Sequence, residues 1–575
     1  MPPARPHRRR PACLTALVMA WATAMPAWAA STPPVVPTPA ELARPPAGSR
    51  NTELPPERPA AARELGKPED ELRIDVPAYS LSPDAPAALR AALPRLTAAF
   101  VGKDRGFEDL VNAANEVTRF LQRDLGLYLG YAYIPEQVFD GQTVRIAVLE
   151  GRLDRVVLNW PNSPKGLPVE REVVEAYLAR LKPGDVLTVE AVERTVFLIN
   201  DLRGIVTRAE VKAGATPGTA ILEFTPRAEA RYSGSVDADA NGSQFIGAGR
   251  IGAQAIMASP LGRGDGLSAS VLSSHTGGLL FALLGYTSPI GADGFKAGAS
   301  LSAVRYQLDK GDFPLGLDGT GTTFNLFALY PWVRSRNLNL FALGAVNAKR
   351  YADNVAALAT KKQVDDVNIG VSGDFRDSLL TGSVNTFELS LAQGRLQFDG
   401  GAPSGSDDAR RFTKLGFSAS RLQNVVSNRL LAYVTVRGQW ALHNLDSTEQ
   451  FRAGGPNGVR AFAPGEGTGD SGAVASLELR WLPPASLLGR WASELVFAAF
   501  YDAAFVQLRH DPSLTVREPG YVNRTWLGGA GVSLVWARGS QYSFRMSLAT
   551  PTYGEASSAT QDRKLRFYAQ GSWSF

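Results

Sequence analysis

The chain has 575 residues, of which 45% are hydrophobic and 20% are charged, so it is long enough for several domains. Its formal charge of +5 includes four arginines among the first ten residues, and without those four it is +1. Charge therefore gives no argument for nucleic-acid binding. The single cysteine, Cys13, belongs to the same leader, which excludes disulfides and Cys-ligated metals from the rest of the chain.

The first 29 residues have the pattern of a secretory signal peptide. A basic start is followed by an apolar stretch that ends in Ala27-Trp28-Ala29, an A-x-A cleavage pattern. A transmembrane anchor is the alternative, but the apolar core is short and Pro26 interrupts its end. We therefore expect residues 1–29 to be removed on export.

Residues 30–70 are dense in proline, as in "STPPVVPTPAELARPPAGSRNTELPPERPAAARELGKPED". This composition is typical of an extended linker. A plug segment is the alternative for this region.

From 71 to 228 the sequence predicts two copies of a β-α-α-β-β unit, with boundaries at 71–152 and 153–228. Each copy joins strand-like alternation to two segments with apolar residues at helical spacing. Internal repetition of this kind indicates serial modules with similar tasks.

From 229 to 575 the helical period disappears and segments of about ten residues alternate apolar and polar. No segment offers the roughly 20 apolar residues of a transmembrane helix. The pattern predicts a transmembrane antiparallel β-barrel of about 16 strands, with a soluble β-sandwich as the alternative. Phe567, Trp573 and Phe575 share one face of the last strand, and a terminal phenylalanine of this kind is what outer-membrane assembly machinery typically reads.

A glycine-rich loop, "GGPNGVRAFAPGEGTGDSG", carries Arg460 between two apolar residues. Strand parity places Asp502 and Glu478 on the polar, inward side of their strands. Folding the loop (445–472) back into the lumen would bring Arg460 to Asp502 as main partner and Glu478 as lesser partner. A solvated loop arginine is the alternative. In that position an ion pair would add little stability, because an exposed pair contributes only about 0–1 kcal/mol.

The stretch "EQFRAGGPNGVRAFAPGEGTGDSGAVASLELRW" resembles the conserved loop of the two-partner secretion transporters, the TpsB family (FhaC/ShlB/HecB haemolysin secretion and activation type), which shares a POTRA-plus-barrel superfamily with BamA. The segments "GYAYIPEQVFDGQTVRIAVLEGRL" and "LKPGDVLTVEAVERTVFLINDLRGIVTRAEVKAGATPGTAILEF" resemble its two POTRA domains. The resemblance covers about 70–575. The loop motif falls here on Gly455, Val459, Phe462, Gly469 and Asp470.

The resemblance implies an outer-membrane protein with two periplasmic POTRA domains that bind an unfolded TpsA-type exoprotein, of haemolysin or adhesin kind, and a barrel that conducts it to the cell surface. It implies that Arg460 pairs with Asp502 inside the lumen. It also implies that a POTRA module binds an extended peptide at an exposed sheet edge, which we expect "AEVKAG" or "EFTPR" to provide in the second module. Further partners would be membrane lipid and, during biogenesis, the barrel-assembly machinery. Two family glycines are replaced by Ala461 and Ala504, which places the loop pose in question if either position requires φ > 0.

No motif supports an enzyme, a cofactor or a metal site: the three histidines after the leader stand alone and no G-x-S-x-G elbow occurs. The remaining alternatives are a BamA-like assembly factor and a passive porin. A BamA-like factor would normally carry more POTRA modules, and a porin needs neither these modules nor a pinned loop.

Overall fold

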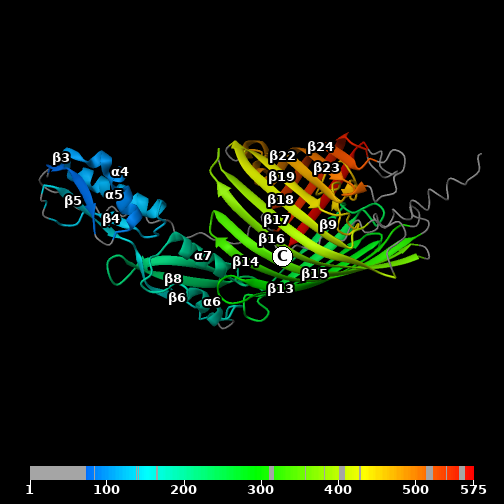
Figure 1. Ribbon diagram of the computed structural model, residues 1–575, viewed down its shortest axis with the longest axis horizontal. Coiled ribbons are helices and arrows are strands. Elements are labelled where there is room, and N and C mark those ends of the chain that lie inside the picture. The colour runs from blue at the N-terminus through cyan, green and yellow to red at the C-terminus, as the bar shows by residue number, and fades with distance from the viewer. Residues whose placement is uncertain are drawn as a thin grey trace, which may run out of the picture.

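The structure is a computed structural model, in which three parts lie in a row: an α+β module, a second α+β module and a β-barrel (Figure 1). It describes residues 73–82, 85–137, 139, 141–162, 166–309, 316–355, 358–380, 382–400, 408–426, 429–512, 522–538, 541–555 and 564–575. The predicted signal peptide and proline-rich linker lie outside the described residues.

The first module is a three-stranded sheet, in the order β2-β5-β4, with two helices packed on it. A further two-stranded sheet, β1-β3, was not expected from the sequence. The elements of this module are β1 (Arg73–Val76), β2 (Ala78–Leu81), α4 (Ala87–Thr97), η1 (Ala98–Phe100), β3 (Gly102–Gly106), α5 (Phe107–Arg123), β4 (Tyr131–Tyr133) and β5 (Thr143–Leu149). Helix α5 begins where the Asp109 carboxylate accepts a hydrogen bond of 3.1 Å from the Gly106 amide, which satisfies one free donor of the first turn.

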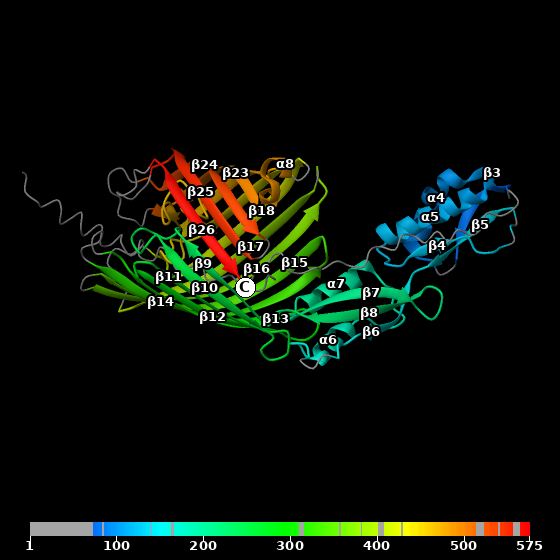
Figure 2. The same cartoon turned by 180° about the vertical axis from the view of Figure 1, so that it is seen from behind.

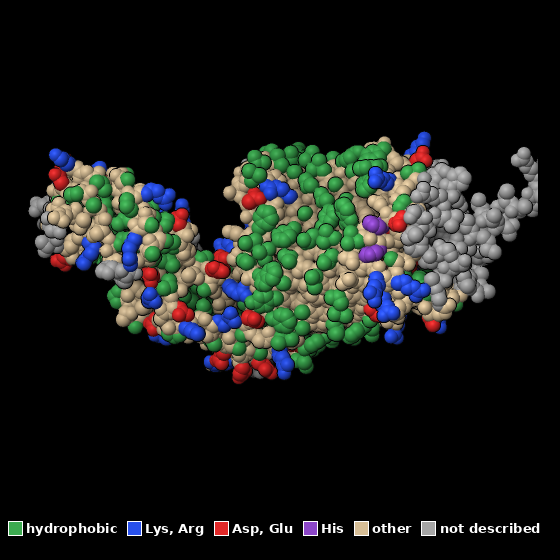
Figure 3. Space-filling view, in the orientation of Figure 1, with side chains coloured by type: hydrophobic (Ala, Val, Ile, Leu, Met, Phe, Trp, Pro, Cys, Tyr) green, Lys and Arg blue, Asp and Glu red, His purple; other side chains and the backbone are tan. Residues whose placement is uncertain are grey.

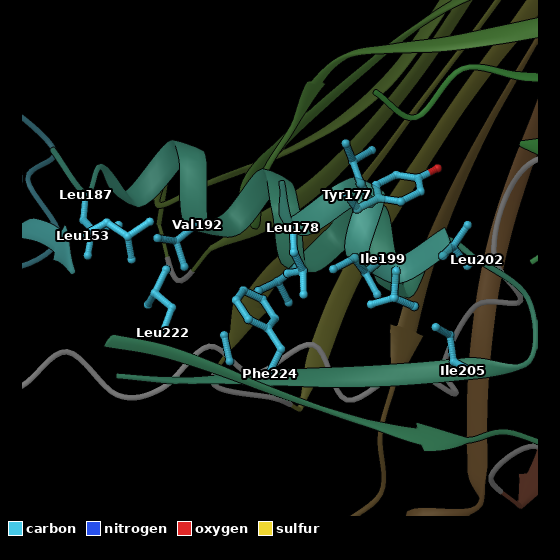
Figure 4. Packing of buried hydrophobic residues seen from close by; sticks show 14 of the residues in the cluster. Leu153, Tyr177, Leu178, Leu187, Val192, Ile199, Leu202, Ile205, Leu222 and Phe224 are labelled. Carbon is cyan, nitrogen blue, oxygen red and sulfur yellow. The ribbon is translucent and has the colours of Figure 1, made fainter. Parts of the chain in front are cut away.

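The second module repeats the plan with the sheet order β6-β8-β7. Its elements are β6 (Arg152–Leu158), α6 (Arg171–Leu178), α7 (Val189–Asn200), β7 (Ile205–Ala213) and β8 (Thr219–Ala228). Thr188 caps α7 by accepting a hydrogen bond from the Ala191 amide through Oγ1. Figure 4 shows Tyr177 and Leu178 of α6 and Ile199 of α7 above Leu222 and Phe224 of β8, all five buried. Among the described residues, no helix has the length and hydropathy to cross a membrane.

One of the two predicted peptide-binding edges is wrong. The "EFTPR" segment lies in β8, which is the central strand and pairs with both β6 and β7. The parallel β6–β8 pairing arises because the chain crosses from β6 to β7 through two helices before the β7–β8 hairpin closes. The "AEVKAG" segment lies at the end of β7, which is an edge strand among the described strands of this sheet.

The barrel is closed, antiparallel and sixteen-stranded, as the alternation predicts, with β26 returning to pair with β9 (Figure 2). Its strands are β9 (Tyr232–Asp239), β10 (Arg250–Ala258), β11 (Gly266–Ser274), β12 (Leu279–Pro289), β13 (Lys296–Gln307), β14 (Leu317–Arg334), β15 (Leu338–Val355), β16 (Leu358–Asp377), β17 (Ser383–Asp399), β18 (Arg411–Val426), β19 (Leu430–Ala441), β22 (Ser471–Trp481), β23 (Leu495–Gln507), β24 (Arg524–Arg538), β25 (Tyr542–Tyr553) and β26 (Arg566–Ser574). A short helix, α8 (Ala485–Leu488), and a 3-10 turn, η2 (Gly489–Ser493), join β22 to β23.

The outer wall of the barrel is apolar. Figure 3 shows hydrophobic side chains spread over the whole barrel face, with charged side chains gathered toward its ends. Parity explains the surface, because successive strand residues face opposite sides. In β23, Phe497 and Tyr501 are exposed while Phe500 and Asp502 are buried. In such a closed barrel every strand pairs with two neighbours, so the backbone polar groups are hydrogen-bonded and the apolar side chains face the lipid.

The second module docks onto the barrel end nearest to it. Arg194 of α7 donates to the carbonyl oxygens of Pro331 (3.0 Å), Trp332 (3.3 Å) and Asp293 (3.2 Å). Directly after α7, the Asp201 carboxylate accepts two hydrogen bonds from the Arg334 guanidinium, at 2.9 and 2.8 Å. These contacts join α7 and Asp201 to the turn after β12 and to the end of β14, so this end of the barrel faces the modules.

The "GRGDG" segment (262–266) also takes part in this joint. It lies in the turn between β10 and β11, and its last residue, Gly266, begins β11. The Gly262 carbonyl accepts from the Glu170 amide at 2.7 Å, and the Gly264 carbonyl accepts from the Arg203 amide at 3.0 Å. The turn thus serves as a main-chain dock for the second module.

Candidate functional site

The segment between β19 and β22 folds into the barrel. We call residues 442–470 the lumen loop. It contains a small ladder of β20 (Phe451–Arg452) and β21 (Thr468–Gly469), and most of its residues are buried. A solvated surface loop would be exposed over this length, so the loop packs against the inner wall.

Arg460 lies at the tip of the lumen loop and contacts Asp502 of β23. Its guanidinium donates through Nε to Oδ2 at 2.9 Å and through Nη2 to Oδ1 at 2.8 Å. The Arg460 amide adds a third bond to Oδ2 at 3.0 Å. Asp502 is fully buried and Arg460 is 8% exposed. This two-pronged geometry is the strong form of an arginine–carboxylate pair, and it fixes both the side chain and the loop backbone.

Two further wall residues complete the contact. Glu478 of β22 accepts from Arg460 Nη1 at 2.7 Å, and it also accepts from Arg480 at 2.7 and 2.8 Å. Ser476 accepts from Arg460 Nη2 at 3.0 Å and donates to Asp502 at 2.6 Å. Two guanidinium groups therefore face two carboxylates, so the buried charges are balanced within the cluster.

The Arg460 guanidinium also lies over an aromatic ring. Its central carbon is 3.3 Å from the centre of the Phe500 ring, on the strand that carries Asp502. A desolvated cation over an aromatic face gains a further cation–π attraction. The Phe500 ring thus contacts one face of the Arg460 guanidinium, and the two carboxylates bind its edges.

The loop motif residues build the turn that presents Arg460. The Gly455 amide donates to the Phe462 carbonyl at 3.1 Å, and the Val459 amide donates to the Ala453 carbonyl at 2.8 Å. Val459 and Phe462 are buried in an apolar cluster with Phe500. These main-chain hydrogen bonds and buried side chains make the tip a compact turn.

The other two motif residues lie where the loop returns to the wall. An added Cβ on Gly469 would come within 2.4 Å of the Gln507 carbonyl oxygen, so glycine permits this close backbone approach. Asp470 is fully buried and accepts from Gln450 Nε2 (2.8 Å) and from the Leu445 and His510 amides (3.1 and 2.8 Å). Asp470 therefore ties the two ends of the lumen loop together.

The alanines that replace family glycines fit without backbone strain. Neither Ala461 nor Ala504 is among the non-glycine residues with positive φ in the described chain. Both are buried in the same apolar cluster as Val459. The Ala461 methyl group occupies space left by Gly529 of β24, where an added Cβ would lie 2.5 Å from the Ala461 Cβ.

The C-terminal aromatic residues lie elsewhere, on the outer wall. Phe567, Trp573 and Phe575 are 53%, 60% and 69% exposed, as their shared parity predicts. Phe575 also closes the barrel through its backbone, which exchanges two hydrogen bonds of 3.0 Å with Gly234 of β9. These residues form no contact with the Arg460 site.

Three contacts of the site were not anticipated from the sequence. Ser476 and Phe500 share the inward parity of Glu478 and Asp502, so the alternation could have identified them. Tyr568 donates through its hydroxyl to the Phe462 carbonyl at 2.8 Å. It lies in β26, so only barrel closure brings it to the loop tip.

A closed membrane barrel with an inward-folded loop and α+β modules at one end defines a class of outer-membrane transport proteins. The family model "Haemolysin secretion/activation protein ShlB/FhaC/HecB" matches residues 218–507, and "POTRA domain, ShlB-type" matches 85–151. The chain belongs to the ShlB/FhaC/HecB family.

Relatives agree with this assignment. The haem/hemopexin transporter protein HuxB of Haemophilus influenzae (strain 86-028NP) is 26% identical over 468 residues, which cover 79% of each chain. The solved structure of CdiB from Escherichia coli superposes with a TM-score of 0.67 at 19% identity, over 92% of this chain and 94% of that one. BamA from Haemophilus ducreyi lacking POTRA domains 1–3 shares the fold, with a TM-score of 0.51 at 14% identity over 88% and 100%.

The chain is therefore a two-partner secretion transporter of the outer membrane, with POTRA-like modules before its barrel. The family is one of transporters, and membership implies a secreted TpsA-type partner.

Proposed function

We propose that this transporter moves an unfolded exoprotein of haemolysin or adhesin kind from the periplasm to the cell surface, with the lumen loop latched in the bore by Arg460. In this proposal residues 71–152 and 153–228 are two POTRA domains, and residues 229–575 are the conduit. The observation that carries it is the buried contact of Arg460 with Asp502 and Glu478, which joins the inward-folded loop to the barrel wall.

Cargo binding is assigned to the edge of the second module. β7 is unpaired on one side among the described strands, and its end lines a groove of about 610 Å³. Leu129 and Tyr131 of the first module and Val211 and Ala213 of β7 contribute to this groove. An extended cargo segment can add to such an edge through main-chain hydrogen bonds, which bind many sequences, while apolar walls receive alternate side chains.

The barrel supplies the remaining steps without an enzymatic reaction, a metal or a cofactor. Lipid contacts the apolar outer wall, and the assembly machinery recognises Phe567, Trp573 and Phe575 during biogenesis. Folding of the exoprotein outside the cell gives the transport its direction. Nucleic acid has no part in this proposal.

The test is co-expression of the chain with a TpsA-type N-terminal secretion domain carrying its own signal peptide, with measurement of the fragment in the medium. We expect secretion by the parent chain and loss of secretion with Arg460→Ala. A general decrease of outer-membrane barrels on depletion of the chain would instead indicate a BamA-like factor. Entry of small sugars into vesicles, with no secretion of the fragment, would indicate a porin.

A further inference from the structure

A second charged cluster in the bore lies away from Arg460 and contacts the beginning of the lumen loop. We call residues 444–450 the loop root. The Asp446 and Glu449 side chains project from one turn, in which the Glu449 amide donates to the Asp446 carbonyl at 2.8 Å. The two residues are 6% and 4% exposed, so both carboxylates are almost wholly removed from water.

Three wall lysines meet these two carboxylates. Lys349 of β15 contacts Glu449 Oε1 at 2.7 Å, and Lys414 of β18 contacts Glu449 Oε2 at 2.9 Å. Each oxygen of Glu449 therefore has its own lysine. Lys362 of β16 lies 2.9 Å from both carboxylate oxygens of Asp446.

The positive and negative charges of the wall do not balance without the loop. Besides the loop carboxylates, the lysines face only two wall carboxylates in these contacts, Asp366 at 3.0 Å from Lys349 and Asp353 at 3.9 Å from Lys362. Three positive charges would thus meet two negative ones without the loop. Asp446 and Glu449 add two negative charges, and Arg452 of the loop, which interacts electrostatically with Glu449, adds a fourth positive charge, so the docked cluster holds four charges of each sign. An uncompensated buried charge is strongly unfavourable.

Hydrogen bonds to the main chain and apolar packing also hold the loop root. Lys414 Nζ and Gln439 Nε2 both donate to the Glu449 carbonyl at 2.9 Å. Leu445 is fully buried in a cluster with Val364 and Phe412 of the wall. The loop root is therefore docked by packing and by charge together.

This cluster shares no residue with the tip contact. Its lysines lie on β15, β16 and β18, and β19 separates these strands from β22 and β23, which carry the tip contact. We propose that Lys349, Lys362 and Lys414 are positioning residues that hold the loop root on the β15–β18 wall independently of the Arg460–Asp502 contact. Release of the tip would then leave a hinged loop, with its root still docked on the β15–β18 wall. This inference goes beyond the proposed latch at Arg460.

The test measures access to the loop root in intact cells. Ser447 is 8% exposed, so Ser447→Cys provides a buried reporter for a membrane-impermeant maleimide. The parent chain, with Cys13 as its one cysteine, gives the background. The matched control is Lys361→Met, which removes the exposed lysine next to Lys362 on the same strand.

We expect Lys362→Met and Lys349→Met to raise the labelling rate by at least about tenfold, because an unpaired buried carboxylate favours local opening. Lys361→Met and Arg460→Ala should leave the rate unchanged. Equal labelling of Lys362→Met and Lys361→Met would overturn the proposal. An equal increase in Arg460→Ala would also overturn it, because the two contacts would then form one lock.

A charge exchange separates positioning from general packing. Lys362→Asp combined with Asp446→Lys should restore slow labelling, while each single change should accelerate it. Labelling of the double variant that stays as fast as in the single variants would contradict a specific ion pair. Asp446→Asn makes the same test from the loop and changes no strand, so it remains informative if a lysine variant fails to assemble. Labelling needs no exoprotein, so its outcome is separate from that of the secretion assay.

Discussion

Two arginine–aspartate contacts hold this molecule together at different places, one in the bore and one at the joint with the second module. Arg460 and Asp502 join the lumen loop to the wall, with side chains 9% and 0% exposed. Arg334 and Asp201 join the barrel to the segment after α7, with side chains 12% and 9% exposed. Both are paired through Nε and Nη2, so the hydrogen-bond chemistry is the same.

The surroundings of the two contacts differ. Arg460 meets a second carboxylate, Glu478, and lies 3.3 Å from the centre of the Phe500 ring. Arg334 adds a neutral amide oxygen, Asn339 Oδ1 at 2.7 Å, and lies 4.9 Å from the centre of the Phe197 ring. Removal of Arg460 would leave two buried carboxylates, Asp502 and Glu478, beside the single Arg480 guanidinium, so we expect the bore contact to tolerate this loss less well than the joint.

The largest effect is expected from the bore. Arg460→Ala and Asp502→Ala should each abolish most secretion, since removing one partner of a buried pair costs about 3–5 kcal/mol. The double variant should be little worse than either single variant, because the two residues act as one contact. Secretion of the co-expressed fragment measures this, and the mobility of unheated samples in gels reports barrel assembly. Full secretion by the Arg460→Ala variant would show that the contact of Arg460 with the wall is not needed for transport.

We expect loss of the Arg334–Asp201 contact to reduce secretion less than loss of the Arg460–Asp502 contact. Arg334→Ala or Asp201→Ala removes a charge-assisted contact worth about 1.5–3 kcal/mol, while Arg194 and the main-chain bonds of Gly262 and Gly264 remain. We expect reduced but measurable secretion and faster protease cleavage between the second module and the barrel. A loss as complete as that of Arg460→Ala would mean that the two contacts are equivalent.

A smaller effect is expected where packing supports the loop tip. Gly529→Ala would place a methyl group 2.5 Å from the Ala461 Cβ, an overpacking that costs about 1–3 kcal/mol. Lower heat resistance of the folded barrel in gels should follow, with recovery in the double variant Gly529→Ala, Ala461→Gly. Gly344→Ala is the matched control, since an added Cβ there meets no atom within 4 Å. Failure of Ala461→Gly to restore stability would exclude this contact as the cause.

The smallest effect is expected at an exposed pair in the second module. The Lys212 ammonium donates a hydrogen bond that lowers the pKa of the Glu223 carboxyl. Any contribution to stability is therefore present at neutral pH and lost as the pH falls through that lowered pKa. Because solvent screens this pair, Lys212→Met should leave the melting temperature unchanged at neutral pH. A clear decrease would show that exposure does not decide the ranking of these contacts.

The sequence alone determined the barrel and the facing of its residues. A period of two assigns every strand residue to one side, so Asp502 and Glu478 could be placed inward and Phe567, Trp573 and Phe575 outward. The helices of both modules followed from their apolar spacing, and Arg460 stood out as a charge in a glycine-rich loop. These are local properties, which neighbouring residues set.

Only the tertiary structure decided which strands and loop residues meet. β8 became the central strand, against the expectation for "EFTPR", because β6 pairs with it in parallel after a long crossover. Tyr568 reaches the loop tip because β26 closes on β9, and Lys349, Lys362 and Lys414 meet Asp446 and Glu449 because the loop turns back into the bore. Parity gives the side on which a residue lies but not the depth or direction of a folded loop, so contacts between distant segments depend on the closed cylinder.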